Sequence, residues 1–320
     1  MRKHLLQAVA LLGLVAGSVG LATGAQAAGD PQSCHTVRFS NVGWTDITAT
    51  TGTASFILQA LGYNPTTTLL SVPVTYEEMK DKKIDVFLGN WMPTMVDNIK
   101  PYLANKTVDV VRANLEGAKY TLAVPTYLYD AGLKSFQDIH NFYKQLDGKI
   151  YGIEPGNDGN RLILGMIKNN TDDLGKFTLV QSSEQGMLSE VGRKVPRKQA
   201  IVFLGWEPHP MNTKFDMKYL SGGDAVFGPN YGGATVYTNT SAGYVQACPN
   251  VGKFLQNLQF NLDMENTIMG YIMYDKMDPQ PAAEKYLKAH PDVLTSWLAG
   301  VTTEDGSQPA LPVVKKALGL

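Results

Sequence analysis

The chain has 320 residues, of which 44% are hydrophobic and 18% are charged, and its formal net charge is -1. This composition is typical of a globular protein, and the weak acidic balance argues against nucleic acid as a partner, because nucleic-acid-binding surfaces are basic. The length that remains after the N-terminal segment is too great for one ordinary core and favours two lobes.

The first residues are typical of a secretory signal peptide. A basic start at residues 1–4 precedes an apolar run at 5–21, and Ala25-Gln26-Ala27 has the small-x-small spacing that a signal peptidase recognises. A membrane anchor is the competing interpretation, but the run is short and is interrupted by Gly and Ser. We therefore expect residues 1–27 to be a cleaved signal peptide and the mature protein to be periplasmic.

Cys34 and Cys248 are the two cysteines of the sequence. In an oxidising compartment an even pair predicts a disulfide, and two free thiols are the alternative. A bond between them would place segments near both ends of the mature chain in the same lobe. The middle of the chain would then form an inserted second lobe.

Strand and helix patterns alternate along the first third of the chain. The periodicity predicts strands at 36–40, 67–72 and 84–88 and helices at 48–61 and 75–81. Gly62 is placed to end the first of these helices. Alternating strands and helices indicate an α/β lobe with a largely parallel sheet.

A second series of elements follows Gly117. Hydrophobic periodicity predicts strands at 120–125, 149–153, 201–205 and 234–237 and helices at 133–139, 162–167, 251–257, 264–273 and 281–288. A glycine-rich stretch at 222–233 marks a place where the chain can cross back. With crossovers near Ala118 and Tyr231, we expect residues 28–117 and 232–320 in lobe I and residues 118–231 in lobe II.

One short segment occurs twice, as VFLGNWMP at 86–93 and as VFLGWEP at 202–208. Three apolar residues followed by Gly predict a buried strand that runs into a tight bend, with a Trp just beyond the bend. Open parallel sheets bind ligands outside the carboxyl ends of their strands. We therefore expect Trp91 and Trp206 to face a shared cleft, one from each lobe, and two core tryptophans are the alternative.

The sequence lacks the familiar motifs of catalysis. It contains no Gly-x-Ser-x-Gly, Ser-x-x-Lys or His-Glu-x-x-His segment and no phosphate-binding loop, and its histidines show no metal-ligand spacing. The loop at 156–159 could receive an anion at a helix start, but Asp158 would repel it, and helix capping by Asn157 or Asp158 is the simpler interpretation. We expect no catalytic residue, no metal and no cofactor.

Aromatic residues gather at the ends of the expected strands. Trp44, Trp91 and Trp206 each follow a strand, and Tyr120 opens one. Aromatic rings present negative faces to a central cation, and they suit a quaternary ammonium group, which has diffuse charge and no hydrogen-bond donor. A sugar ring is the alternative ligand for such rings, but sugar sites also need many polar partners, and few polar residues lie nearby.

Five segments carry a resemblance to a known family: GWTDI at 43–47, FLGNWMP at 87–93, GAKYTL at 117–122, IEPGNDGN at 153–160 and FLGWEPHP at 203–210. They closely resemble segments of the substrate-binding proteins of betaine/choline ABC transporters, and the resemblance covers essentially the whole mature chain. It implies a type II, two-lobed periplasmic binding protein, in which each lobe is a mixed, mostly parallel sheet flanked by helices. Such a protein is not an enzyme, and it closes on its ligand and delivers it to an inner-membrane permease.

The resemblance also implies roles for six residues. Trp44, Trp91, Tyr120 and Trp206 would form an aromatic box around a trimethylammonium group, and Asp46 and Asn157 would hold the hydroxyl of choline.

Asp46 favours choline over glycine betaine. The carboxylate of betaine would meet that of Asp46 in a desolvated cleft, whereas the choline hydroxyl can donate to it. Lys119 could pair with a betaine carboxylate, but strand alternation points it away from the side of Tyr120. The alternative role of Asp46 is the N-cap of the helix that follows.

Other functions remain open at this point. Glycine betaine or proline betaine is the alternative ligand, and acetylcholine is a further candidate. A secreted choline-ester hydrolase and a sensory module that reports choline to a receptor are the rival functions. Delivery to a transporter suits a monomer, which is the state we expect.

Overall fold

The computed structural model describes residues 29–320, whose nine strands form one hydrogen-bonded sheet. The strands are β1 (Thr36–Asn41), β2 (Asn64–Leu69), β3 (Val86–Met92), β4 (Val108–Pro125), β5 (Lys149–Tyr151), β6 (Thr178–Val180), β7 (Phe203–Glu207), β8 (Met217–Tyr219) and β9 (Gly233–Ser241). Their order is β2-β1-β3-β9-β4-β7-β5-β6, and β8 pairs with β4 outside this path. The expected signal peptide at 1–27 lies outside the described residues.

Parallel pairing occupies both ends of the sheet, and antiparallel pairing occupies its middle. β1 pairs in parallel with β2 and β3, and β5 pairs in parallel with β6 and β7. Between these groups, β9 lies antiparallel to β3 and β4, and β4 lies antiparallel to β7. Parallel neighbours need crossover connections, which the helices supply. The prediction of a mixed α/β fold with flanking helices is confirmed.

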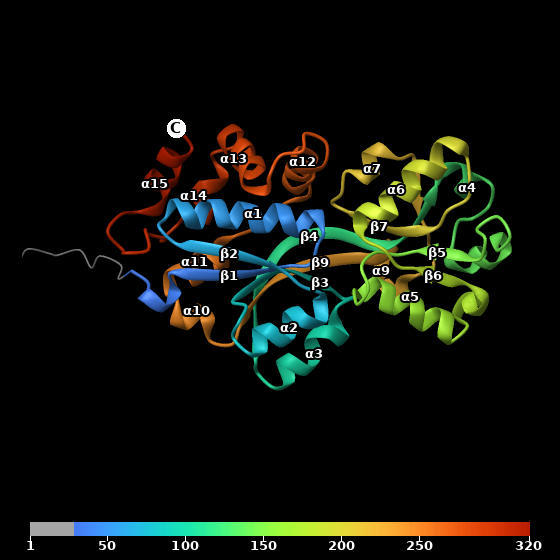
Figure 1. The fold of residues 1–320 in the computed structure, drawn as a ribbon, viewed down its shortest axis with the longest axis horizontal. Helices are drawn as coiled ribbons and strands as arrows, with labels where there is room; N and C mark the ends of the chain where they lie inside the picture. The colour runs from blue at the N-terminus through green and yellow to red at the C-terminus, as the bar shows by residue number, and fades with distance from the viewer. Residues whose placement is uncertain (1–28) are drawn as a thin grey trace, which may run out of the picture.

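Helices cover the sheet on both sides (Figure 1). They are α1 (Thr45–Ala60), α2 (Val72–Lys80), α3 (Val96–Ala104), α4 (Thr126–Asp130), α5 (Asp158–Lys168), α6 (Glu184–Lys194), α7 (Met211–Lys214), α8 (Asp224–Phe227), α9 (Pro229–Gly232), α10 (Tyr244–Ala247), α11 (Pro249–Asn257), α12 (Leu262–Met273), α13 (Pro279–Ala289), α14 (Val293–Trp297) and α15 (Ala310–Ala317). Short 3-10 helices are η1 (Gln32–Cys34), η2 (Phe136–Phe142), η3 (Thr171–Lys176) and η4 (Val195–Arg197). Within residues 29–320 we find no helix with the length and apolar character of a membrane span.

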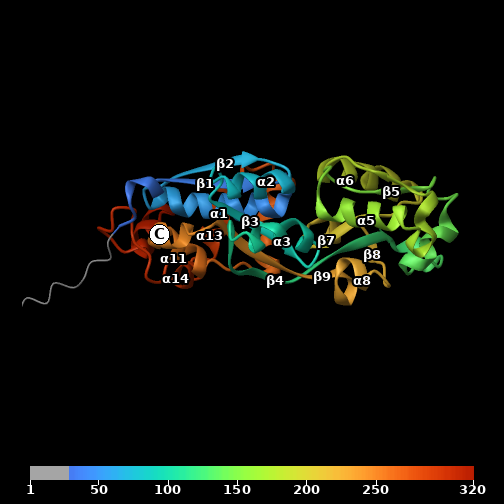
Figure 2. The same cartoon turned by 90° about the horizontal axis from the view of Figure 1, so that it is seen from below.

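The elements gather at two ends of an elongated molecule that β4 and β9 connect (Figures 1 and 2). One group contains β1, β2 and β3 with α1, α12 and α13, and the other contains β5 and β7 with α5 and α6. The expected crossover at Ala118 lies in the ladder between the long strands, opposite Ala234. We call the elements around β1, β2 and β3 the first group and those around β5 and β7 the second group. The lobe boundaries at 117/118 and 231/232 stay a prediction.

The repeated VFLG segments form strands that continue through their tryptophans. Trp91 lies within β3 and Trp206 lies within β7, so the expectation of a tight bend between Gly and Trp was wrong. The glycine of the first copy serves packing, because a Cβ at Gly89 would lie 2.6 Å from Cδ1 of Ile47 on α1. Gly89 therefore lets the first turn of α1 approach β3 closely.

Several elements differ from the sequence expectations in extent. β2 begins at Asn64, three residues before the expected start at residue 67. Its first residues pair with β1, beginning with Asn64 opposite Thr36, although they lack an apolar pattern. β4 begins at Val108 because β9 pairs with it well before Tyr120. The helix expected at 133–139 is the 3-10 helix η2. The sequence expectations also omitted β6 and α6, and the latter proves important for the site.

Candidate ligand-binding site

The N-terminus of α1 presents two of the predicted site residues. β1 ends at a turn through Gly43, whose φ of 89° favours glycine, and Trp44 then takes the N-cap position of the helix. Asp46 lies in the first helical turn, and both side chains are buried. The alternative role of Asp46 as the N-cap is therefore wrong, because Trp44 occupies that position.

Trp91 of β3 contacts this helix start through a hydrogen bond. Its indole Nε1 donates to Oδ2 of Asp46 at 3.1 Å. The second carboxylate oxygen of Asp46, Oδ1, is buried and has no hydrogen-bond partner. Since buried polar atoms are normally paired, this oxygen is an acceptor available to a donor inside the site.

Tyr120 and Trp206 face the same side of the sheet because they are direct partners in the β4–β7 ladder. Their ring centroids lie 6.2 Å apart at an interplanar angle of 83°, and Tyr120 lies 6.0 Å from the Trp91 ring at 62°. Close approach of Tyr120 to α5 requires glycine at 159, where a Cβ would lie 2.0 Å from the tyrosine oxygen.

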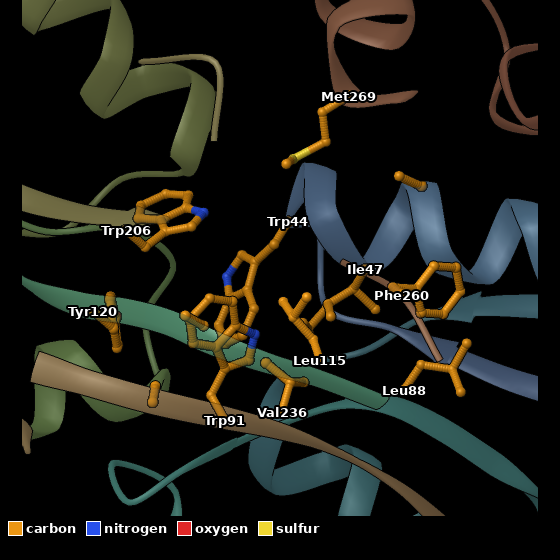
Figure 3. Packing of buried hydrophobic residues seen from close by; sticks show 14 of the residues in the cluster. Trp44, Ile47, Leu88, Trp91, Leu115, Tyr120, Trp206, Val236, Phe260 and Met269 are labelled. Atoms are coloured by element: carbon orange, nitrogen blue, oxygen red, sulfur yellow. The ribbon is translucent and has the colours of Figure 1, made fainter. Parts of the chain in front are cut away.

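These side chains line one cavity, whose space of about 230 Å³ includes open solvent. Figure 3 shows the rings of Trp44, Trp91, Tyr120 and Trp206 gathered near the start of α1. The lining residues are Trp44, Asp46, Trp91, Tyr120, Ile153 and Trp206. Five of the six residues that the sequence singled out for ligand binding therefore meet at a single place. Trp44, Asp46 and Trp91 come from the first group of elements, Trp206 comes from the second, and Tyr120 lies on the connecting strand β4.

Asn157 does not belong to the lining of this cavity. It is the N-cap of α5, and its Oδ1 accepts hydrogen bonds from the backbone N–H of Asn160 at 2.8 Å and from the Tyr120 hydroxyl at 3.3 Å. Its amide group donates to the carbonyl oxygen of Glu154. The structure thus places Asn157 behind Tyr120, as a helix cap and a partner of the ring, and its contact with a ligand hydroxyl stays a prediction.

Burial and neighbouring carboxyl groups dominate the electrostatics of the site. Burial, reinforced by the nearby Glu184, raises the pKa of Asp46 to about 7. Burial also raises the pKa of Glu154, and burial together with Asp46 raises the pKa of Glu265 well above its ordinary value. Asp46 lines the cavity, and its ionised carboxylate in this desolvated site is complementary to a cation.

Sequence reasoning missed the residues that hold the site from outside. The indole Nε1 of Trp44 donates to Oε2 of Glu154 at 3.1 Å. Glu184, at the start of α6, accepts a hydrogen bond from the backbone N–H of Thr45 at 2.8 Å. Glu154 lies in the segment IEPGNDGN at 153–160, to which the sequence resemblance gave no role at this position. Nothing in the local sequence around Glu184 signals a contact with α1.

The structure also tests the expected disulfide and the expected direction of Lys119. Cys34 and Cys248 form a disulfide with a Cα–Cα distance of 5.7 Å, as predicted. Lys119 points away from the cavity and pairs with Glu207, with Nζ and Oε2 3.2 Å apart. In the part of the chain that the structure describes, no three His, Cys, Asp or Glu side chains cluster in a way that could hold a metal ion.

Solved structures with the same fold include close relatives. An ABC-transporter choline-binding protein in complex with choline is 60% identical with a TM-score of 0.89, over 91% of this chain and 100% of that chain. An ABC-transporter choline-binding protein in an unliganded semi-closed conformation is also 60% identical, with a TM-score of 0.83 over 90% of this chain and 100% of that one. Lactococcal OpuAC, closed on glycine betaine, is 26% identical with a TM-score of 0.74, over 82% of this chain and 98% of that chain.

Two relatives match parts of the chain by sequence. GbuC of Listeria monocytogenes, a glycine betaine/carnitine transport binding protein, is 30% identical over 171 residues, which is 53% of this chain and 56% of GbuC. The protein ORF1 of Chromohalobacter salexigens is 54% identical over 129 residues, which is 40% of this chain and 83% of ORF1. The family model for the substrate-binding domain of ABC-type glycine betaine transport systems, OpuAC, matches residues 35–289. This is a family of binding proteins and not of enzymes, and the chain belongs to it.

Proposed function

We propose that the cavity binds the trimethylammonium group of choline. Trp44, Trp91, Tyr120 and Trp206 line it, and no lining residue carries a positive charge. An aromatic ring attracts a desolvated cation by about 0.5 to 2 kcal/mol, so several rings together support binding of a quaternary ammonium group. The relative that is 60% identical was solved with choline, which agrees with this proposal.

The unpaired oxygen of Asp46 is the observation that carries the choice of ligand. Oδ1 of Asp46 is buried beside the aromatic rings and lacks a donor. Choline has a hydroxyl donor two carbons from its cationic nitrogen and a net positive charge. Glycine betaine has no donor and adds a second carboxylate, which costs several kcal/mol against a like charge in a desolvated site.

Glycine betaine is the second candidate, because the matching family model describes glycine betaine transport and lactococcal OpuAC was solved with that ligand. Its cationic head would fit the same rings. Protonation of Asp46, whose raised pKa of about 7 is described above, would relieve the repulsion between the two carboxylates. Betaine binding should therefore be favoured at low pH.

We propose further that the protein works in the periplasm as a monomer and delivers its ligand to the permease of an ABC importer, after export directed by residues 1–27. Lobe I would comprise residues 28–117 and 232–320, and lobe II would comprise residues 118–231. Trp44, Asp46 and Trp91 would then line the cavity from one lobe and Tyr120 and Trp206 from the other, so that a bound ligand holds both lobes together.

A thermal-shift screen at pH 8 tests the ligand. A ligand that binds only the folded state raises the melting temperature according to its concentration and Kd. We expect choline to give the largest shift, acetylcholine a smaller one because its ester has no hydroxyl donor, and glycine betaine and carnitine the smallest. With about seven heavy atoms, choline is limited to roughly 10 kcal/mol of binding free energy, or a Kd of tens of nanomolar. A larger shift with betaine than with choline would overturn the choice.

A further inference from the structure

The helix that carries Trp44 and Asp46 lacks a side-chain cap of its own. Its N-cap residue is Trp44, whose side chain makes no capping hydrogen bond. The first N–H groups of a helix have no partner within the helix, and they attract negative charge. A helix start that is buried beside a ligand site therefore needs an acceptor from elsewhere in the fold.

Glu184 of the second group supplies this acceptor. Its Oε2 accepts from the backbone N–H of Thr45 at 2.8 Å, and its Oε1 accepts from the Thr45 hydroxyl. Thr45 is the first residue of α1 and lies between Trp44 and Asp46 in sequence. The glutamate thus contacts the one residue whose neighbours on both sides line the cavity.

His209 holds Glu184 from the other side. The backbone N–H of Met211 donates to Nδ1 of His209 at 2.9 Å, so this nitrogen is an acceptor. In the neutral ring the hydrogen is then on Nε2, which lies 3.2 Å from Oε1 of Glu184 and donates to it. The side chains of Glu184 and His209 are fully buried. Of the donors to this carboxylate, His209 comes from the second group and Thr45 from the first.

A second glutamate reinforces the same contact. Oε1 of Glu154 accepts from the backbone N–H of Glu184 at 3.0 Å, while its Oε2 accepts from the Trp44 indole at 3.1 Å. Trp44 and Thr45 are therefore held by two glutamates that lie 110 and 139 positions later in the chain, respectively. The arrangement exists only when the two groups of elements meet.

We infer that Glu184 is a positioning residue for ligand binding, which caps α1 when the two groups meet and so sets Trp44 and Asp46 against the rings of Tyr120 and Trp206. The inference rests on the proposed function. Glu184 also adds negative charge near Asp46. A cation in the cavity offsets this repulsion, so the contact with Thr45 is favoured by a bound cation more than by an empty cavity.

Glu184→Gln and Thr45→Val test the inference with choline as the probe. The glutamine cannot accept from all three donors, and the valine removes only the hydroxyl donor. We expect Glu184→Gln to raise the Kd for choline at least about tenfold, mostly through faster dissociation, because lost closing contacts act on koff. Stopped-flow tryptophan fluorescence gives both rates. Thr45→Ser, which keeps the hydroxyl, should bind like the wild type.

Two measurements separate positioning from general stability. In a double-mutant cycle, Thr45→Val should weaken choline in the wild type and have little further effect in Glu184→Gln, because the partners act together. Small-angle X-ray scattering at saturating choline should show a larger radius of gyration for Glu184→Gln than for the wild type.

Asp97→Asn is the matched control, since Asp97 also bridges the groups, through an exposed ion pair with Arg161 at 2.8 Å. Exposed ion pairs contribute little free energy, so the Kd of Asp97→Asn for choline should stay within about twofold of that of the wild type. Loss of affinity in Asp97→Asn equal to that in Glu184→Gln would overturn the inference, as would additive effects in the cycle or a Kd within twofold for Glu184→Gln. Absence of choline binding in the wild type would instead refute the proposed function.

Discussion

The indole of Trp91 donates a hydrogen bond of 3.1 Å to Oδ2 of Asp46, so an aromatic wall of the cavity and its carboxyl group orient each other. The contact joins β3 to the first turn of α1. It satisfies one oxygen of Asp46 and leaves the other, Oδ1, without a partner. A ligand that carries both a cation and a hydroxyl donor would complete this arrangement.

Removal of one ring should weaken the ligand without unfolding the protein. We expect Trp206→Ala to raise the Kd for choline at least about tenfold, because it removes a desolvated cation–π contact and opens the cavity to water. Isothermal titration calorimetry measures the affinity, and circular dichroism checks the fold. Tyr143→Ala is the control, because Tyr143 is an aromatic residue of the second group that is 41% exposed. Unchanged affinity in Trp206→Ala would contradict the aromatic site.

Neutralisation of Asp46 should change selectivity as well as affinity. Asp46→Asn keeps the shape of the side chain but removes the negative charge and the repulsion against a ligand carboxylate. We expect choline to bind more weakly and glycine betaine to lose less affinity or to gain some, with a change in their ratio of about tenfold or more. Competitive binding by calorimetry measures this ratio. A loss that is greater for betaine than for choline would show that the carboxylate does not select the ligand.

Choline affinity should rise with pH. Choline does not titrate, whereas Asp46 has a pKa raised to about 7 by burial. A cation favours the ionised carboxylate, so the affinity should increase between pH 5 and pH 8, by at most about tenfold per pH unit below the pKa. Asp46→Asn provides the control and should have a much flatter profile. An equal slope in both proteins would assign the pH dependence to another group.

The same carboxyl group should make the ligand-free protein less stable as pH rises. Its pKa is about 7 in the folded protein and 3.8 as an ordinary aspartate, so the folded state retains the proton over this interval. The contribution of Asp46 to the free energy of unfolding is therefore fully present below about pH 4, falls up to about pH 7 and is level above it. Between about pH 4 and pH 7, the free energy of unfolding of Asp46→Asn, measured by urea denaturation, should therefore rise by up to about 4 kcal/mol relative to that of the wild type. Parallel profiles of the two proteins would contradict this.

The disulfide should contribute to stability and not to ligand binding. Cys34 and Cys248 are separated by 214 positions, and closure of a long loop restricts the unfolded chain. We expect Cys34→Ser combined with Cys248→Ser to lower the free energy of unfolding by about 3 to 5 kcal/mol. Neither cysteine lines the cavity, so the Kd for choline should stay the same. A large change in Kd would show that the bond also shapes the site.

Much of the site was predictable because its chemistry is local in the sequence. Trp91 and Trp206 stand in two copies of one apolar segment, and Trp44 and Asp46 stand two positions apart at the start of a periodic helix. Buried strands and amphipathic helices have periods that a single segment displays on its own. The bend expected before Trp91 was wrong because Gly89 serves packing against α1, a contact that no local pattern reveals.

The sequence by itself determined the α/β class, the pairing of Cys34 with Cys248 and the set of aromatic residues at the cavity. Tertiary structure decided that Asn157 stands behind Tyr120 and that Glu184 caps a helix 139 positions away, at Thr45. The difference has a physical reason. Periodicity and residue type report what each segment buries, whereas the partner of a buried carboxylate depends on which segments the completed sheet and its helices bring into contact.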